Sequence, residues 1–485
     1  MTQIRDLLRQ AREFQRRSDF AAMAEQAERA LEFQPQRLDV LFLWAETLIC
    51  SGKIAAARVQ LGEIEQLAGS DAAAWNQLVL FYTQLGRLQA AYDGAKRLQS
   101  LMPNSPNALF TVASAATAVG RIDEAETLLD TIISTDPDQA EAYCTRATLR
   151  RQSHEKNHIQ DLKLRLAETR DGAAGEVPLC YALGKECEDL GEFEQSFTYF
   201  ARGAAARHAR LSYDVATDEG VTAEIVATFD EAWRNESAQG SDIDGPIFVF
   251  GLPRSGTTLV DRILDAHPEV SSLGEVNDFA YAVMRAGGPA SGKSELIKAV
   301  ADADLTALGE GYWNALQGYG ESAPNLIDKT PANYLYLGMI MQALPSARIV
   351  HVRRHPMASG YAMFKALFRM GYPFSYDLEQ IGGYYAAYHR LMEHWRNLYP
   401  GRILDVDYEA LVDDQEAVSR EIVHHCQLKW SDACLTYHKN ATPTATASAA
   451  QVREPIYRQA RDLWRNVEHH LEPMARILRA EGVIE

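Results

Sequence analysis

The residues best suited to chemistry lie between Gly251 and Thr258, in the run Gly-Leu-Pro-Arg-Ser-Gly-Thr-Thr. Its two glycines have the G-x-x-x-x-G spacing of a P-loop, whose backbone N–H groups surround a phosphate. A P-loop continues with lysine, but Thr257 stands in that place here. Because that lysine neutralises the β- and γ-phosphates of a triphosphate, its absence disfavours ATP or GTP hydrolysis. Arg254 and three hydroxyl side chains remain, which suits a smaller, less charged anion.

The residues on either side of this loop predict how it is held. Residues 247–250 form an apolar run that is typical of a strand buried on both faces of a parallel sheet. Residues 259–264 have helical spacing, so the loop leads into a helix N-terminus, where N–H groups point at an anion. An ordinary glycine turn between a core strand and a helix is the alternative, because G-x-x-x-x-G alone is a weak pattern.

The rest of the second half alternates strand and helix. Further strands are expected at 325–328, 348–352 and 402–406, with helical stretches between them at 294–319, 333–344 and from 357 onward. This alternation predicts a doubly wound, mainly parallel sheet. Ligands bind at the carboxyl ends of such strands, and the polar groups of the second half follow the strands there. They include Lys329, Arg353, Arg354 and Tyr408.

The first half of the chain repeats itself. Gly52, Gly86 and Gly120 are spaced 34 residues apart, and mostly small residues precede them at the same interval. A period of 34 with two helical patterns per unit is the tetratricopeptide signature. Another such unit surrounds Gly191, and the charged stretch 150–176 is a degenerate unit or a linking helix. The array is expected to hold a peptide or to pack on a neighbouring domain, and a purely structural stack is the alternative.

These patterns predict two domains. Residues 214–236 look helical, and the Gly/Ser/Asp-rich stretch after them marks a boundary. We therefore expect a helical repeat domain at 1–236, a linker at 237–245 and an α/β domain at 246–485. The predicted fold class is an all-α tetratricopeptide solenoid followed by a P-loop-like α/β domain with a mainly parallel sheet.

Composition narrows the function. The net charge of −18 argues against broad binding to nucleic acid or to anionic membranes. No apolar run is long enough to cross a bilayer and the N-terminus shows no secretory signal, so a cytoplasmic protein is expected. The six cysteines are scattered without a C-x-x-C pair, which indicates small buried side chains. No metal-ligand motif accompanies the polar groups of the second half, so no metal is expected there.

Several short motifs occur in the order of a known family. On these motifs the chain resembles bacterial sulfotransferases with an N-terminal tetratricopeptide region, and its second half is similar to tyrosylprotein sulfotransferases. The resemblance implies 3′-phosphoadenosine 5′-phosphosulfate (PAPS) as the donor. The matching stretches are Pro253–Leu259, Leu264–Pro268, Gly274–Glu275, Asp328–Pro331, Val352–Pro356, Asp407–Val412 and Ser448–Val452 followed by Pro455.

The resemblance also implies catalytic roles. Lys329 corresponds to the lysine that stabilises the leaving phosphate, and Glu275 to the general base. The family pattern has two glutamates after the glycine and favours the second, which is Val276 here, so His267 and Asp278 stay as alternative bases. The 5′-phosphate would be held by the glycine loop, through Arg254, Ser255, Gly256, Thr257, Thr258 and Leu259.

The same resemblance assigns the rest of the donor site. Arg354, with Arg353 beside it, corresponds to the arginine that binds the 3′-phosphate. The family serine eight residues later is Ala362 here, so either Ser359 substitutes for it or the contact is lost. The remaining candidates are Tyr408 near the adenosine, Ser448 near the sulfate and Arg453 near the 3′-phosphate.

The leading hypothesis is therefore an enzyme that transfers a sulfuryl group from PAPS to a hydroxyl or amine by in-line displacement. A peptide or protein recruited by the repeats is one candidate acceptor, and carbohydrate, lipid and small-molecule acceptors stay open. One alternative is a P-loop-like nucleotide kinase or NTPase, which Thr257 opposes. The other is a catalytically inactive, repeat-based binding protein, which Val276 and Ala362 favour.

Overall fold

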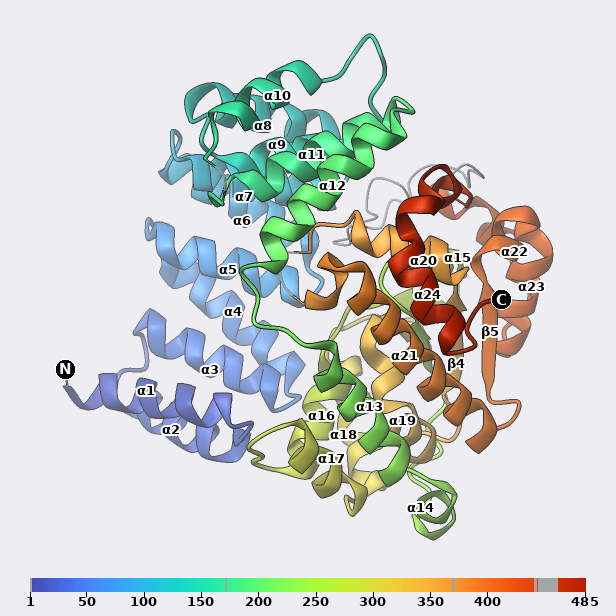
Figure 1. Cartoon of the computed structure of the whole chain (residues 1–485). Coiled ribbons are helices and arrows are strands. Elements are labelled where there is room, and N and C mark those ends of the chain that lie inside the picture. The colour runs from blue at the N-terminus through green and yellow to red at the C-terminus, as the bar shows by residue number, and fades with distance from the viewer. Residues whose placement is uncertain (1, 171, 369–370, 440–442, 444–460) are drawn as a thin grey trace.

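The first half of the chain is a stack of helix pairs (Figure 1). The computed structural model describes residues 2–170, 172–368, 371–439, 443 and 461–485. Successive helices pack on one another and form a curved array along one side of the molecule. Its helices are α1 (Thr2–Arg16), α2 (Phe20–Phe33), α3 (Leu38–Cys50), α4 (Ile54–Ala68), α5 (Ala72–Gln84), α6 (Leu88–Leu101), α7 (Pro106–Ala118), α8 (Ile122–Thr135), α9 (Ala140–Leu149), α10 (Ile159–Glu168), α11 (Glu176–Asp189) and α12 (Phe193–His208).

The turn glycines of the repeats adopt the backbone conformation that their spacing predicts. Gly52, Gly86, Gly120 and Gly191 have φ values of 72°, 66°, 82° and 81°, which a residue without Cβ adopts readily. Ser18 has a φ of 56° at the position 34 residues before Gly52. Helices α1 and α2 therefore form one more pair, which the sequence pattern hid because serine replaces the glycine.

In the last repeat pair, α11 and α12, a small residue on one helix faces a large residue on the other. A Cβ atom added at Gly184 of α11 would lie 2.6 Å from the ring of Phe200 on α12, so the large ring requires the glycine. In earlier repeats the position of Gly184 is occupied by Ala45, Val79 or Ala113. Their counterparts of Phe200 are the smaller residues Leu61, Ala95 and Leu129.

The second half contains a parallel five-stranded sheet, counted over the described residues, in the order β2-β3-β1-β4-β5. The central strand β1 pairs with β3 on one side and β4 on the other, so that Phe248 lies opposite both Asp328 and Ile349. All four pairings are parallel, which confirms the predicted fold class. The strands are β1 (Pro246–Phe250), β2 (Val270–Ser272), β3 (Asn325–Asp328), β4 (Arg348–Arg353) and β5 (Ile403–Asp407).

Helices cover both faces of this sheet (Figure 1). They are α15 (Thr257–Asp265), α16 (Asp278–Gly287), α17 (Lys293–Ala301), α18 (Leu305–Gln317), α19 (Leu337–Ala343), α20 (Pro356–Phe364), α21 (Leu378–Leu398), α22 (Tyr408–Asp413), α23 (Gln415–His425) and α24 (Glu472–Ala480). Short 3₁₀ helices are η1 (Pro331–Tyr336), η2 (Pro373–Tyr376), η3 (Asp432–Lys439) and η6 (Leu463–Leu471).

Two expected helices differ from the prediction. The stretch expected to be one helix at 294–319 is divided into α17 and α18, because Asp304 caps α18 by accepting from two N–H groups of its first turn. The expected helix at 333–344 begins instead as a 3₁₀ turn at Pro331. Helices α13 (Val215–Thr228) and α14 (Glu231–Glu236) precede the predicted linker, yet α13 packs on α21 and α17 of the second half.

The hydrophobic cores of the two halves are continuous. On β1, Ile247 and Val249 belong to a core beneath α15, whereas Phe248 and Phe250 belong to the core on the opposite face. That second core extends into the repeats through Phe200 of α12 and as far as Cys144 of α9. The repeat array and the sheet domain therefore share buried apolar surface, which favours one relative placement.

Polar contacts reinforce this junction. Glu188 of α11 accepts a hydrogen bond from Tyr361 of α20 at 2.7 Å and pairs at 2.5 Å with Lys365, the residue that follows this helix. Near the other end of the array, Arg285 donates to the carbonyl of Cys50 at 2.8 Å. The α3–α4 turn therefore contacts the sheet domain directly.

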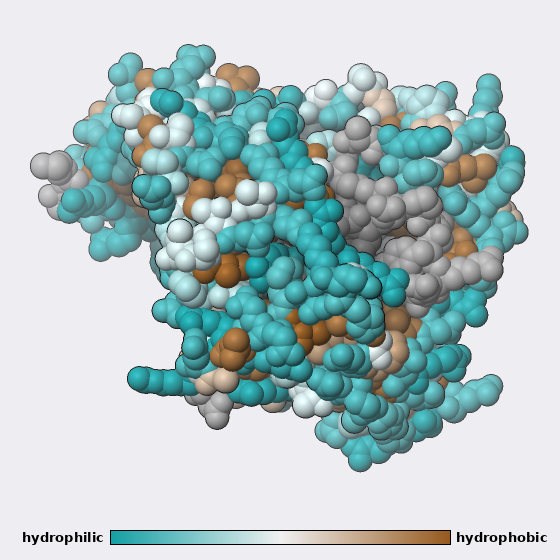
Figure 2. Space-filling model, turned by 90° about the horizontal axis from the view of Figure 1, so that it is seen from above, coloured by the Kyte–Doolittle hydropathy of each residue, from teal (hydrophilic) through white to brown (hydrophobic). Residues whose placement is uncertain are grey.

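The surface shows hydrophobic residues as small, separate groups among hydrophilic ones on the face in Figure 2. Across the described residues, we find no helix with the length and apolar character that crossing a membrane requires. All six cysteines are buried and free, as the sequence predicts.

The packing at Gly184 generates a test with a matched control. Gly184→Ala is expected to lower the free energy of unfolding by about 1–3 kcal/mol, because the new methyl group clashes with Phe200. Gly62→Ala on α4 is expected to raise it by up to about 1 kcal/mol, since the added Cβ meets no described atom within 4 Å beyond its chain neighbours and its own helix backbone, and alanine favours helix. Urea unfolding followed by circular dichroism measures both, and a stabilised Gly184→Ala variant would contradict the packing.

Candidate active site

The glycine loop between β1 and α15 approaches its neighbours too closely for any other residue. A Cβ atom at Gly251 would lie 2.2 Å from the carbonyl oxygen of Val352, and one at Gly256 would lie 2.5 Å from the ring of Tyr408. Gly256 also has a φ of 108°, and Arg254 has a φ of 67°, which is uncommon for a residue with a side chain. Backbone strain of this kind concentrates at ligand sites.

The loop ends at the N-terminus of α15, which begins at Thr257. Thr257 and Thr258 are buried, and the N-cap position, Gly256, provides no side chain to cap the first-turn N–H groups. Among the described residues, the buried hydroxyl oxygen of Ser255 has no hydrogen-bond partner. Leu259 packs its side chain on the core beneath the sheet, and its N–H donates to the carbonyl of Gly256 at 2.9 Å. The loop therefore offers N–H and hydroxyl groups to an anion.

Lys329 and Glu275 meet beside this loop. Lys329 follows β3 directly, and its Nζ atom lies 2.5 Å from Oε1 of Glu275. The lysine side chain is 1% exposed and the glutamate 49% exposed. The backbone N–H of Lys329 donates to the carbonyl of Gly274 at 2.9 Å, so the segments after β2 and β3 are joined. The structure thus brings together the two residues that the sequence singled out separately.

Two buried carboxyl groups near this pair were given no role in the sequence prediction, although Asp328 belongs to one of the matching stretches. Asp261 on α15 accepts from the Ser272 hydroxyl at 2.5 Å, and burial raises its pKa to about 6 although the charge of Lys329 lowers it. Asp328 accepts from Tyr312 at 2.9 Å, and burial raises its pKa to about 7. The pattern that could have marked them is an acid within a helix or strand whose other residues are mostly buried. The burial that raises their pKa values follows only from the tertiary packing.

The last residue of β4, Arg353, and the next residue, Arg354, have different surroundings. Arg353 forms a two-pronged ion pair with Asp407, with donor–acceptor distances of 2.7 and 3.1 Å. Arg354 donates to the carbonyl of Arg254 at 3.2 Å, and its guanidinium carbon lies 4.9 Å from the ring centroid of Tyr408. Arg354 therefore faces the glycine loop, whereas Arg353 binds β5.

The other residues predicted from the sequence differ in whether their polar atoms already have hydrogen-bond partners. Ser359 on α20 is 1% exposed, and its hydroxyl has no hydrogen-bond partner among the described residues. His267 accepts from the N–H of Glu269 and contacts the carbonyl of Lys429 at 2.7 Å, so both ring nitrogens are occupied. Asp278, the first residue of α16, accepts a hydrogen bond from the Tyr319 hydroxyl at 2.7 Å. Ser448 and Arg453 lie outside the described residues.

A cleft opens near Glu275. It has a volume of about 460 Å³, and its wall includes Tyr372, whose φ of 49° is again uncommon. Burial and the negative charge of Glu275 raise the pKa of Tyr372, so the phenol stays protonated. The cleft is lined by Ser212, Tyr213, Asp214, Thr217, Asp218, Val221, Thr222, Lys293, Leu335, Gly371, Tyr372, Pro373, Phe374 and Tyr384.

Comparisons with known proteins agree with this architecture. Residues 246–432 match the model of the sulfotransferase family, and residues 82–149 match the model of the tetratricopeptide repeat. The two-part resemblance predicted from the motifs is therefore confirmed, and the second half contains a sulfotransferase-family domain.

Three curated relatives show how far the similarity extends. An uncharacterized protein of Aquifex aeolicus (strain VF5) is 28% identical over 409 residues, which cover 81% of this chain and 52% of that protein. A putative protein-tyrosine sulfotransferase of Caenorhabditis briggsae is 28% identical over 46% of this chain and 82% of its own length. The Drosophila melanogaster protein-tyrosine sulfotransferase is 25% identical over 45% of this chain and 46% of its own length. This chain thus spans about half the length of two of these relatives.

The buried carboxyl group of Asp328 predicts a pH dependence of stability. Its pKa rises from 3.8 to about 7 on folding, so between these pH values the folded state binds more protons and the free energy of unfolding falls as pH rises. At about 1.4 kcal/mol per pKa unit the loss amounts to several kcal/mol. Asp328→Asn removes the titrating group, so its urea midpoint is expected to fall less than that of the wild type between about pH 4.5 and pH 7.5.

The exposed residue Asp93 provides the matched control for this comparison. Asp93→Asn is expected to leave the wild-type pH profile unchanged. Parallel profiles for the wild type and Asp328→Asn would contradict a titrating carboxyl group in the core.

Proposed function

We propose that this protein is a PAPS-dependent sulfotransferase that moves a sulfuryl group to a hydroxyl or amine by in-line displacement. The observation that carries the proposal is the convergence of the glycine loop, Lys329 and Glu275 at the carboxyl ends of β1, β3 and β2. Transfer of this kind requires alignment and charge stabilisation, with little covalent work for the protein.

The loop is suited to the 5′-phosphate of the donor. The backbone N–H groups of residues 256–258, the Arg254 guanidinium and the hydroxyls of Thr257 and Thr258 would hold it. The N–H groups of Ser255 and Leu259 already donate to the carbonyls of Leu252 and Gly256. Two features of the structure fit such a group: the hydroxyl of Ser255, which has no hydrogen-bond partner among the described residues, and the N-cap residue Gly256, which has no side chain to cap the N–H groups of the helix. PAPS supplies the activated sulfuryl group, and the chain supplies its orientation.

The far end of the donor would lie over β4. Arg354 would bind the 3′-phosphate, because its guanidinium faces the loop while Arg353 is held by Asp407. Tyr408 would lie beside the adenosine, under Gly256. The Ser359 hydroxyl, which is buried on the helix after Arg354, would add a contact in place of the family serine replaced by Ala362. Ser448 and Arg453 stay candidates for the same donor.

Lys329 and Glu275 differ in solvent exposure, and this difference supports a different catalytic role for each. Lys329 is almost fully buried, so its compact charge would stabilise negative charge on the leaving phosphate inside the site. Glu275 is half-exposed and would accept the proton of the acceptor on the open side. The cleft beside Tyr372 would admit that acceptor.

The repeats lie close enough to the site to present a peptide or protein acceptor. A Cβ atom at Gly86, in the α5–α6 turn, would lie 3.6 Å from the carbonyl of Leu273, two residues before Glu275. The segment that follows α12 lines the cleft with Tyr213 and Asp218. An acceptor bound along the array would therefore reach Glu275 without crossing the molecule.

Two other functions are alternatives that the tests distinguish from this proposal. A P-loop-like kinase would need ATP and Mg²⁺, which the lysine-free loop does not favour. A catalytically inactive binding protein would retain the repeats without needing the Lys329–Glu275 pair.

The arginine pair provides a direct binding test. We expect adenosine 3′,5′-bisphosphate to bind at least tenfold more tightly than ATP with Mg²⁺ in isothermal titration calorimetry. Arg354→Ala is expected to weaken bisphosphate binding by about 1.5–3 kcal/mol, or more than tenfold, because a charged hydrogen bond to phosphate is lost. Arg353→Ala, next to it, is the matched control and should change binding by less than about threefold.

Equal effects of the two substitutions would contradict the proposed 3′-phosphate site. Preferred binding of ATP with Mg²⁺ would favour the kinase instead.

A further inference from the structure

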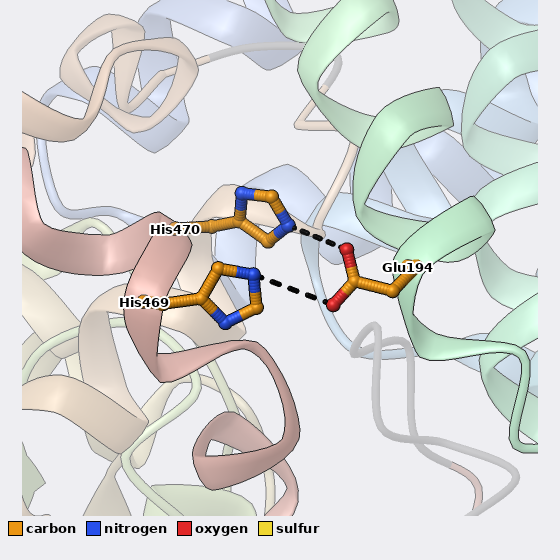
Figure 3. A group of neighbouring side chains, drawn as sticks. All are labelled: Glu194, His469 and His470. Atoms are coloured by element: carbon orange, nitrogen blue, oxygen red, sulfur yellow. Dashed lines mark hydrogen bonds and ion pairs between the residues drawn. The ribbon is translucent and has the colours of Figure 1, made fainter.

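A group of metal-ligand side chains lies where the repeat array meets the C-terminal segment. Glu194 extends from the first turn of α12, and His469 and His470 extend from η6 (Figure 3). Glu194 and His470 are 276 residues apart in the sequence. The residues belong neither to the glycine loop nor to the cleft, and the sequence offered no spacing motif for them because they meet only through tertiary packing.

Both imidazoles point at the same carboxylate. Nε2 of His470 lies 2.9 Å from Oε2 of Glu194, and Nε2 of His469 lies 3.4 Å from Oε1 (Figure 3). One ligand atom from each of the three side chains lies within 4.8 Å of the others. Zinc bonds to nitrogen and oxygen are about 2.0–2.1 Å long, so ligand atoms at the corners of a tetrahedron are about 3.3 Å apart. The observed separations therefore need little adjustment around an ion.

The two rings are also held in place. His470 stacks on Phe197 with ring centroids 4.2 Å apart and an interplanar angle of 4°. Phe197 lies three residues after Glu194, on the same face of α12, and is buried. The His469 ring lies 4.0 Å from that of His470. Because packing fixes the rings before an ion arrives, less side-chain freedom would be lost on binding.

The group remains open to solvent. Glu194 and His469 are 67% and 63% exposed, and His470 is 32% exposed. An ion can therefore enter, and water can complete its coordination. Surface ion pairs alone contribute little to stability, so two histidines directed at one exposed carboxylate would gain little from ion pairing.

We propose that Glu194, His469 and His470 bind one divalent transition-metal ion of the zinc class. Two imidazole nitrogens and one carboxylate are a ligand set that suits zinc and its neighbours. The ion joins α12 of the repeats to η6 and thereby fastens the C-terminal segment onto the array. Phe197 also stacks on Phe364 of α20, with ring centroids 5.6 Å apart. The proposed metal site is therefore connected through Phe197 to the helix that carries Ser359.

Zinc binding is the direct test. The full-length protein, stripped with a chelator and equilibrated with Zn²⁺, is expected to retain one zinc per chain by mass spectrometry of the metal. The His469→Ala, His470→Ala double substitution is expected to weaken zinc binding more than about tenfold, since losing even an outer partner of a ligand costs about 10–100-fold. Glu194→Gln keeps the shape of the side chain and is expected to weaken it similarly.

His389→Ala is the matched control, because His389 also faces a glutamate, Glu393, at 3.5 Å but has no third ligand group nearby among the described residues. Its zinc binding should equal that of the wild type. Zinc should raise the melting temperature of the wild type and of His389→Ala by more than that of Glu194→Gln. The absence of bound zinc in the wild type, or equal binding by the double variant, would overturn the site. Circular dichroism of each variant checks that it folds.

Discussion

The parallel pairing of β1 with β3 and β4 is the constraint on which the candidate site depends. It places the ends of these strands at one edge of the sheet, so the glycine loop, Lys329 and Arg354 follow them side by side. The pairing is tight: the Gly251 position leaves no room for a Cβ atom beside Val352. Cations that come from separate parts of the sequence are thereby gathered at the edge of the sheet that carries the glycine loop. The positive charge that a P-loop takes from its own lysine here comes from a different strand.

The repeats belong to the same physical unit as the sheet. Their hydrophobic core continues into the core under β1, and Glu188 joins α11 to the helix that follows β4. A helical array that merely recruits partners would not need such a junction. The α5–α6 turn also approaches the segment that carries Glu275, so the array contacts the candidate site directly.

Local patterns predicted most of the architecture, and long-range packing decided the rest. The 34-residue period, the apolar strand at 247–250 and the glycine loop were readable because each depends on neighbouring residues. The α1–α2 pair was hidden because Ser18 adopts the conformation that glycine has elsewhere. Sequence alone placed Lys329 and Glu275 in the site through family resemblance, but their contact, the buried state of Asp328 and the different surroundings of Arg353 and Arg354 follow from tertiary structure.

Transfer of label from PAPS tests the central claim most directly. The protein would be incubated with a fractionated lysate and with PAPS labelled either in its sulfur or in its adenine, and the fractions would then be counted. We predict that the sulfur label enters an acceptor, that the adenine label does not, and that Glu275→Gln slows transfer by about 10²–10⁴-fold. Transfer of neither label, transfer of the adenine label, or an unimpaired Glu275→Gln variant would contradict sulfuryl transfer at this site.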